Sequence, residues 1–236
     1  MHNPILVALD FTEARRAVSI ARQVAPHVGG FKVGLELLTG PGPATVAAVR
    51  ELGLPVFVDA KLHDIPNTVH RAARNLGAVG ARWVTAHAAG GSAMLEAAVE
   101  GLGEGAGGHP AGILAITVLT SLDAAQLAAT GIPATPGKQV ARMARLAADA
   151  RVEGVVCAVK ELGDVAQVTP DLIKVTPGIR PSGADTHDQA RVATPGEAIR
   201  RGADWLVIGR AITRDRDPAR AAEAIQREVA QAAAAL

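Results

Sequence analysis

Residues 56–69 read VFVDAKLHDIPNTV, an apolar and β-branched run that ends abruptly in charge. Its first residues are typical of a buried strand. Asp59, Lys61 and Asp64 follow at once, and a proline soon closes the segment. Burying an unpaired charge is costly, so charged groups at the end of a core strand need partners or a purpose. The end of this strand is therefore a candidate site.

The same succession of strand and helix recurs along the whole chain. Short apolar runs predict eight strands, at residues 5–10, 31–35, 56–61, 83–88, 113–119, 154–159, 172–178 and 205–210. Between them lie Ala-, Leu- and Arg-rich stretches with helical spacing, such as residues 13–25 and 137–150. Near-continuous apolar strands indicate a parallel sheet covered by helices on both faces.

Eight such units predict an α/β fold, a single-domain (β/α)₈ TIM barrel over residues 1–236. A doubly wound open sheet is the alternative, but it often begins with a Gly-rich dinucleotide turn, which LDFTEA after the first strand lacks. Two Gly- and Pro-rich stretches are predicted loops. Residues 101–112 precede the fifth strand as a plain connector, and residues 176–188 follow the seventh as a candidate lid over the site face.

Composition excludes several classes of function. The chain has 24 basic and 23 acidic residues and no basic block, and only 2% of its residues are aromatic, so we expect no nucleic-acid partner. The single cysteine, Cys157, lies in an apolar run and can form no internal disulfide, which favours the cytoplasm. No stretch approaches the roughly 20 apolar residues of a membrane span, and no signal peptide is evident, so we expect no membrane association.

Polar residues recur at the predicted carboxyl ends of the strands, which meet at one face of a barrel. They are Asp10, Lys32, Asp59, Lys61, Asp64, His87, Thr120, Ser121, Thr176, Arg180, Gly209 and Arg210. Asp59 and Lys61 are two residues apart, so both should point to the same side of their strand, within reach of Lys32. We expect Lys32, Asp59, Lys61 and Asp64 to form an alternating network whose members stay ionised by mutual attraction. His87 is predicted to be structural.

These segments resemble one known family. The motifs VALD, KVG, DAKLHDIPNTV, HAAGG, TVLTS, VTPGIRP and VIGRAIT occur in the order found in orotidine 5′-phosphate decarboxylases, from Asp10 to Ile212. The resemblance implies decarboxylation of orotidine 5′-phosphate to uridine 5′-phosphate, the last step of de novo UMP biosynthesis, without a cofactor or metal. Lys61 would then be the proton donor, and Asp59 would either position Lys61 or repel the substrate carboxylate.

The resemblance also implies which residues hold each part of the substrate. Asp10 and Lys32 would contact the ribose hydroxyls, and Thr120 with Ser121 the pyrimidine. Gly209 and Arg210 would hold the phosphate, flanked by Arg180 and Gln189. The segment Asp64, Ile65, Pro66 and Thr68 would reach into the site of a neighbouring subunit, which implies a homodimer with shared active sites.

Two other functions remain open at the level of sequence. One is a sugar-phosphate decarboxylase or synthase on the same barrel, which would use Mg²⁺ and an acidic ligand at the end of the second strand. Glu36 is the nearest carboxylate, but it falls beyond that strand. The other is a non-catalytic sensor of nucleotide phosphates, because a fold alone does not prove activity.

Overall fold

The computed structural model describes residues 3–181 and 193–236, which form a closed barrel of eight parallel strands. Each strand pairs with the next, and β8 pairs with β1. The strands are β1 (Ile5–Ala8), β2 (Gly30–Val33), β3 (Val56–Leu62), β4 (Trp83–His87), β5 (Gly112–Ile116), β6 (Gly154–Val156), β7 (Ile173–Thr176) and β8 (Trp205–Ile208). The predicted barrel is confirmed, and closure between β1 and β8 rules out the open sheet.

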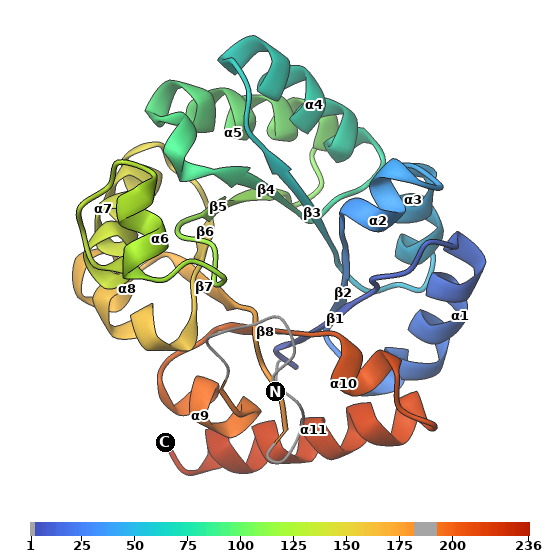
Figure 1. Ribbon diagram of the computed structural model, residues 1–236. Helices are drawn as coiled ribbons and strands as arrows, with labels where there is room; N and C mark the ends of the chain where they lie inside the picture. The colour runs from blue at the N-terminus through green and yellow to red at the C-terminus, as the bar shows by residue number, and fades with distance from the viewer. Residues whose placement is uncertain (1–2, 182–192) are drawn as a thin grey trace.

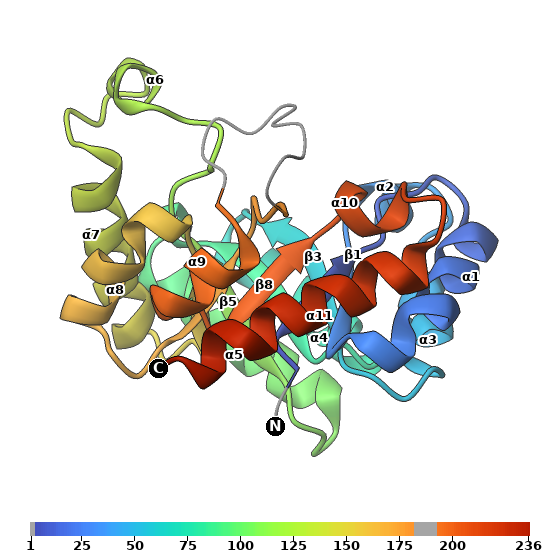
Figure 2. The same ribbon diagram turned by 90° about the horizontal axis from the view of Figure 1, so that it is seen from below.

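Helices surround the ring of strands (Figure 1). They are α1 (Ala14–Val24), α2 (Leu35–Thr39), α3 (Ala44–Arg50), α4 (Pro66–Ala78), α5 (Ser92–Ala106), α6 (Ala124–Ala129), α7 (Pro136–Asp149), α8 (Leu162–Val168), α9 (Pro195–Arg200), α10 (Arg210–Thr213) and α11 (Pro218–Ala234), with short 3₁₀ turns at Ala25–His27, Ala88–Gly90 and Val159–Glu161. In side view, α6 stands beyond the strands at the end of the barrel that also carries α2 and α10 (Figure 2). Among the described residues, no helix is both long and apolar enough to cross a membrane.

The core has two layers because successive side chains of a strand point to opposite faces. Ile5 and Val7 of β1 pack outward against the helices, whereas Leu6 and Ala8 point into the barrel. Large side chains fill the barrel interior, among them Leu6, Phe57, Trp83, Leu114, Val175 and Trp205. Cys157 is buried in the outer layer, and burial raises the pKa of its thiol to about 12, which fits the prediction of a core residue.

The amino-terminal end of the barrel is closed by side chains. The indoles of Trp83 and Trp205 meet edge to face with centroids 5.0 Å apart. Glu153 accepts hydrogen bonds from the two terminal guanidinium nitrogens of Arg82 and one of 3.2 Å from Trp83 Nε1. This packed layer leaves the opposite end of the barrel for a binding site.

One predicted loop is partly wrong. Residues 101–112 were expected to form a connector, but α5 continues through their first half to Ala106. The glycines of α5 allow close packing against α4. A Cβ on Gly101 would lie 2.1 Å from the backbone oxygen of His70, and one on Gly105 would lie 1.9 Å from that of Arg74. The glycines therefore let α5 lie directly against α4, a tertiary gain that outweighs their low helix propensity.

Candidate functional site

The end of β3 departs from regular strand geometry. Val58 pairs with Val84 of β4, but the next pair is Leu62 with Ala86, so four residue steps of β3 oppose two of β4. Within this bulge Lys61 has φ +50°, in the left-handed region that side-chain-bearing residues seldom adopt. Bulges and unusual backbone angles of this kind are concentrated next to active sites.

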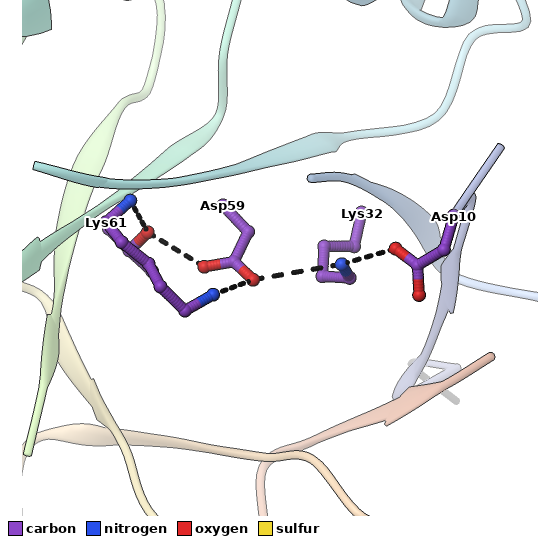
Figure 3. A network of polar contacts seen from close by, with 5 residues as sticks. Asp10, Lys32, Asp59 and Lys61 are labelled. Carbon is purple, nitrogen blue, oxygen red and sulfur yellow. Dashed lines mark hydrogen bonds and ion pairs between the residues drawn. The ribbon is translucent and has the colours of Figure 1, made fainter. Parts of the chain in front are cut away.

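The bulge brings the predicted charges into contact (Figure 3). Lys61 Nζ donates a 2.6 Å hydrogen bond to Asp59 Oδ2, and Lys32 Nζ lies 3.8 Å from the same oxygen. Lys32 Nζ also donates to Asp10 Oδ1 at 2.9 Å. The result is a row of alternating charge from Asp10 to Lys61. The expected contact between Asp59 and Lys61 is confirmed, although a bulge rather than regular alternation produces it.

Lys32 and Asp59 form the buried centre of this row. Their side chains are 11% and 13% exposed, whereas those of Lys61 and Asp10 are 31% and 49% exposed. Lys32 points into the barrel because its neighbours on β2, Phe31 and Val33, pack in the outer layer. The centre is thus shielded from water, and its two ends face the solvent.

The environment keeps Asp59 ionised. Burial by itself would raise the pKa of Asp59, but the ammonium groups of Lys32 and Lys61 outweigh it, with hydrogen bonds from Lys61 and Thr85. The net effect holds the pKa of Asp59 below its ordinary value of 3.8. Asp59 is therefore a carboxylate at neutral pH, as expected for a group between two lysines.

Thr85 is a further member of the network, and the sequence alone does not single it out. Its hydroxyl donates to Asp59 Oδ1 and accepts from the backbone N–H of Lys61, both at 2.9 Å. The side chain is fully buried. The available signal was a hydroxyl residue inside the apolar strand WVTAH, two positions before His87, but nothing in the sequence distinguishes it from a threonine chosen for β propensity.

Asp64 does not join the network within one chain, contrary to expectation. The chain turns outward after Leu62, Pro66 begins α4, and Asp64 lies exposed with its Oδ1 accepting from the backbone N–H of Ile65 at 2.6 Å. It makes no ion pair with any described residue. Ile65 is 67% exposed, and Thr68 is exposed as well.

A cavity of about 320 Å³ opens at the carboxyl ends of the strands. Its polar lining consists of the predicted residues Asp10, Lys32, Asp59, Lys61, Thr120, Arg180, Gly209 and Arg210. Residues from the ends of six different strands thus meet in one place, as the barrel requires. Of the other predicted residues, Ile65, Pro66 and Thr68 lie outside this cavity, and Gln189 lies outside the described residues.

Apolar side chains form much of the remaining wall. Phe57, Ile116, Val118, Val156 and Val207 line the cavity beside the charged row. Such a surface excludes water and so strengthens the electrostatic interactions next to it. Among the predicted strand-end residues, Ser121 and Thr176 are absent from the lining, and Thr176 is fully buried. Glu36, the possible metal ligand of the alternative function, sits on α2 and is absent as well.

His87 borders the charged row but does not line the cavity. Its ring centroid lies 5.3 Å from that of His63. Burial lowers the pKa of His87, the positive potential of His63 and Lys61 lowers it further, and Asp59 opposes them. A neutral imidazole next to the network fits the structural role predicted for it.

Known proteins resemble this chain over nearly its full length. Residues 3–225 match the orotidine 5′-phosphate decarboxylase / HUMPS family. The orotidine 5′-phosphate decarboxylase of Anaeromyxobacter sp. (strain K) is 54% identical over 94% of this chain and 96% of its own, and that of Paramagnetospirillum magneticum is 48% identical over 97% and 99%.

A solved structure has the same fold. The orotidine 5′-phosphate decarboxylase of Lactobacillus acidophilus superposes with a TM-score of 0.85 at 35% identity, covering 96% of this chain and 99% of that one. The motifs, the barrel and these relatives agree, and the chain belongs to the orotidine 5′-phosphate decarboxylase / HUMPS family.

Proposed function

We propose that this protein decarboxylates orotidine 5′-phosphate to uridine 5′-phosphate, the last step of de novo UMP biosynthesis, in the cytoplasm. The observation that carries the proposal is the charged row from Asp10 to Lys61 on the wall of a half-apolar cavity. Relatives about half identical to the chain bear the name of this activity. The cavity volume also falls in the range of small-molecule sites.

Lys61 is the proposed proton donor. Loss of carbon dioxide leaves an electron pair on a ring carbon, and a fixed ammonium beside that carbon stabilises the negative charge before donating a proton to it. Lys61 suits this task because it ends the row, with a side chain 31% exposed, and lines the cavity. In this scheme the charges of the protein stabilise the carbanion, and no step passes through a cofactor or metal.

Asp59 is proposed to position Lys61. Its Oδ2 accepts a 2.6 Å hydrogen bond from the Lys61 ammonium, which restricts the long and otherwise flexible side chain of Lys61. The neighbouring Lys32 keeps Asp59 ionised and is itself anchored by Asp10. Holding the donor in place before substrate arrives avoids reorganisation during the reaction.

The rest of the cavity divides between the parts of the nucleotide. We assign the ribose hydroxyls to Asp10 after β1 and Lys32 on β2, and the pyrimidine to Thr120, which follows β5 across the closed barrel. The phosphate is assigned to Gly209 and Arg210 after β8, with Arg180 after β7 and Gln189 beyond it. Phosphate sites of TIM barrels are frequently built from the loops after the seventh and eighth strands.

The proposed chemistry is tested by replacing Lys61 with alanine. Lys61→Ala should abolish decarboxylation, followed as loss of orotidylate absorbance with a chelator present, while binding of uridine 5′-phosphate remains measurable. Lys160→Ala is the matched control, because Lys160 is exposed and lies outside the cavity. Near-normal turnover by Lys61→Ala would end the assignment, and turnover lost on adding chelator would favour the Mg²⁺-dependent sugar-phosphate alternative.

We further propose a homodimer in which Asp64, Ile65, Pro66 and Thr68 serve the site of the partner subunit. The support is that this segment lies outside its own cavity and exposes Ile65. Mixing inactive Lys61→Ala and Asp64→Ala subunits should restore up to about one quarter of wild-type activity, since half of the dimers are mixed and each has one intact site. No recovery after confirmed subunit exchange would contradict shared sites.

A further inference from the structure

Thr85 lies on β4 directly opposite the bulge of β3. The flanking pairs are Val58 with Val84 and Leu62 with Ala86, so Thr85 is the one β4 residue that faces the extra length of β3. Its side chain is 0% exposed. A fully buried hydroxyl in a strand needs hydrogen-bond partners, and both of its partners belong to the charged row.

The direction of the two hydrogen bonds is determined by the groups involved. The backbone N–H of Lys61 can only donate, so the Thr85 oxygen accepts there at 2.9 Å. The single hydroxyl proton is then free to go to Asp59 Oδ1, also at 2.9 Å. This arrangement requires an acceptor at Oδ1, which the ionised Asp59 supplies.

One hydroxyl therefore constrains two different parts of the site. Asp59 is fixed through both carboxylate oxygens, because Oδ1 is held by Thr85 while Oδ2 receives Lys61. The N–H of Lys61, displaced from the regular ladder by the bulge, finds its partner in the same hydroxyl. Without that bond a partly buried donor would lose its protein partner at a residue whose φ of +50° is already unfavourable.

We propose that Thr85 is a positioning residue for the decarboxylation: its hydroxyl ties the backbone of Lys61 to the carboxylate of Asp59 and thereby aims the Lys61 ammonium into the cavity. The inference rests on the function proposed above. Thr85 is not among the residues that line the cavity, so it acts through Asp59 and Lys61 rather than by touching the substrate.

The test compares Thr85→Val, which keeps the branched shape but removes the hydroxyl, with Thr85→Ser, which keeps the hydroxyl. We expect Thr85→Val to lower kcat roughly 10²-fold, the scale on which misplacing a reacting group by about 1 Å acts. Binding of uridine 5′-phosphate should change little, and Thr85→Ser should restore most of kcat. Thr45→Val is the control, because Thr45 is buried on α3 and its hydroxyl has no hydrogen-bond partner among the described residues.

A crystal structure of Thr85→Val provides a readout that does not depend on activity. We expect the contact between Lys61 Nζ and Asp59 Oδ2, now 2.6 Å, to lengthen and the φ of Lys61 to leave the left-handed region. Wild-type turnover is measured first, and its absence would refute the proposed function. The comparison of the two crystal structures would still test whether Thr85 holds Lys61 and Asp59 in place. An unchanged contact and backbone, a wild-type kcat in Thr85→Val, or a kcat equally low in Thr85→Ser would each overturn the inference.

Discussion

Replacing Asp59 by asparagine removes the one negative charge that two lysines share. The amide keeps the size of the side chain and can still accept from Thr85, so the change is mainly electrostatic. Lys32 retains Asp10 at 2.9 Å, but Lys61 loses its only ion-pair partner among the described residues. The loss of ion pairing should therefore affect Lys61, the proposed proton donor, more than Lys32.

The magnitude follows from burial and distance. Two unit charges about 4 Å apart attract by about 4 kcal/mol at an effective dielectric constant of about 20, and removing one partner of a buried pair typically costs roughly 3–5 kcal/mol. The lower end applies here, because Lys61 is 31% exposed and water can solvate its ammonium. We expect Asp59→Asn to lower the free energy of unfolding by about 3 kcal/mol, which lowers Tm by about 6–12 °C in a chain of this length.

The assay is thermal unfolding of wild type, Asp59→Asn and Asp10→Asn, with kcat measured on the same preparations. Asp10→Asn is the matched control because its side chain is 49% exposed, and exposed ion pairs contribute about 0–1 kcal/mol. Its Tm should fall by less than about 4 °C. Asp59→Asn should also lower kcat by roughly 10²-fold or more, since the proton donor is no longer held.

The pH dependence supplies the refuting result. The pKa of Asp59 in the folded state lies below its ordinary value of 3.8, which applies to the unfolded chain. At a pH between the folded-state pKa and 3.8, the folded state therefore binds fewer protons than the unfolded state. The stabilisation is then fully present above pH 3.8 and is lost as the pH falls through the folded-state pKa. The difference in Tm between wild type and Asp59→Asn should be constant from about pH 5 to pH 8. A difference in Tm that shrinks on approaching pH 5, or no difference at all, would contradict an ionised Asp59 stabilised by the two lysines.

Three further outcomes are expected. Arg210→Ala should weaken binding of uridine 5′-phosphate far more than binding of uridine, measured by calorimetry, and equal losses would argue against a phosphate contact. Because the pKa of His87 is lowered below 6.5 in the folded state, wild type should lose stability as the pH falls below 6.5, and His87→Asn should reduce that loss; identical pH profiles in denaturant unfolding would contradict it. Gly101→Ala should destabilise the fold by about 1–3 kcal/mol, because backbone of α4 occupies the place of the new Cβ. Gly103→Ala has open space and should be neutral or stabilising in the same melts, so similar values for both would contradict close packing through Gly101.

The barrel and most of its site were predictable because both depend on short-range patterns. The eight predicted strands match β1–β8, because a strand buried on both faces appears in the sequence as a near-continuous apolar run. Once the strands are placed, barrel geometry brings their carboxyl ends together, which is why Lys32, Thr120 and Arg210 were expected at one cavity and are found there. The helical part of residues 101–112 was missed because glycine is a poor helix former in isolation, and only contact with α4 explains its presence.

Local sequence patterns were enough to place the eight strands along the chain, to identify the residues at their ends and to reveal the resemblance to a decarboxylase family. How those residues are held depends on packing between strands, which produces the bulge at Lys61, the two hydrogen bonds of Thr85 and the exclusion of Asp64 from its own cavity. The alternation of side chains along a strand predicts which face each residue occupies, but it does not predict where a bulge interrupts that alternation. A bulge depends on the register between β3 and β4, and register is set by contacts between segments far apart in the chain.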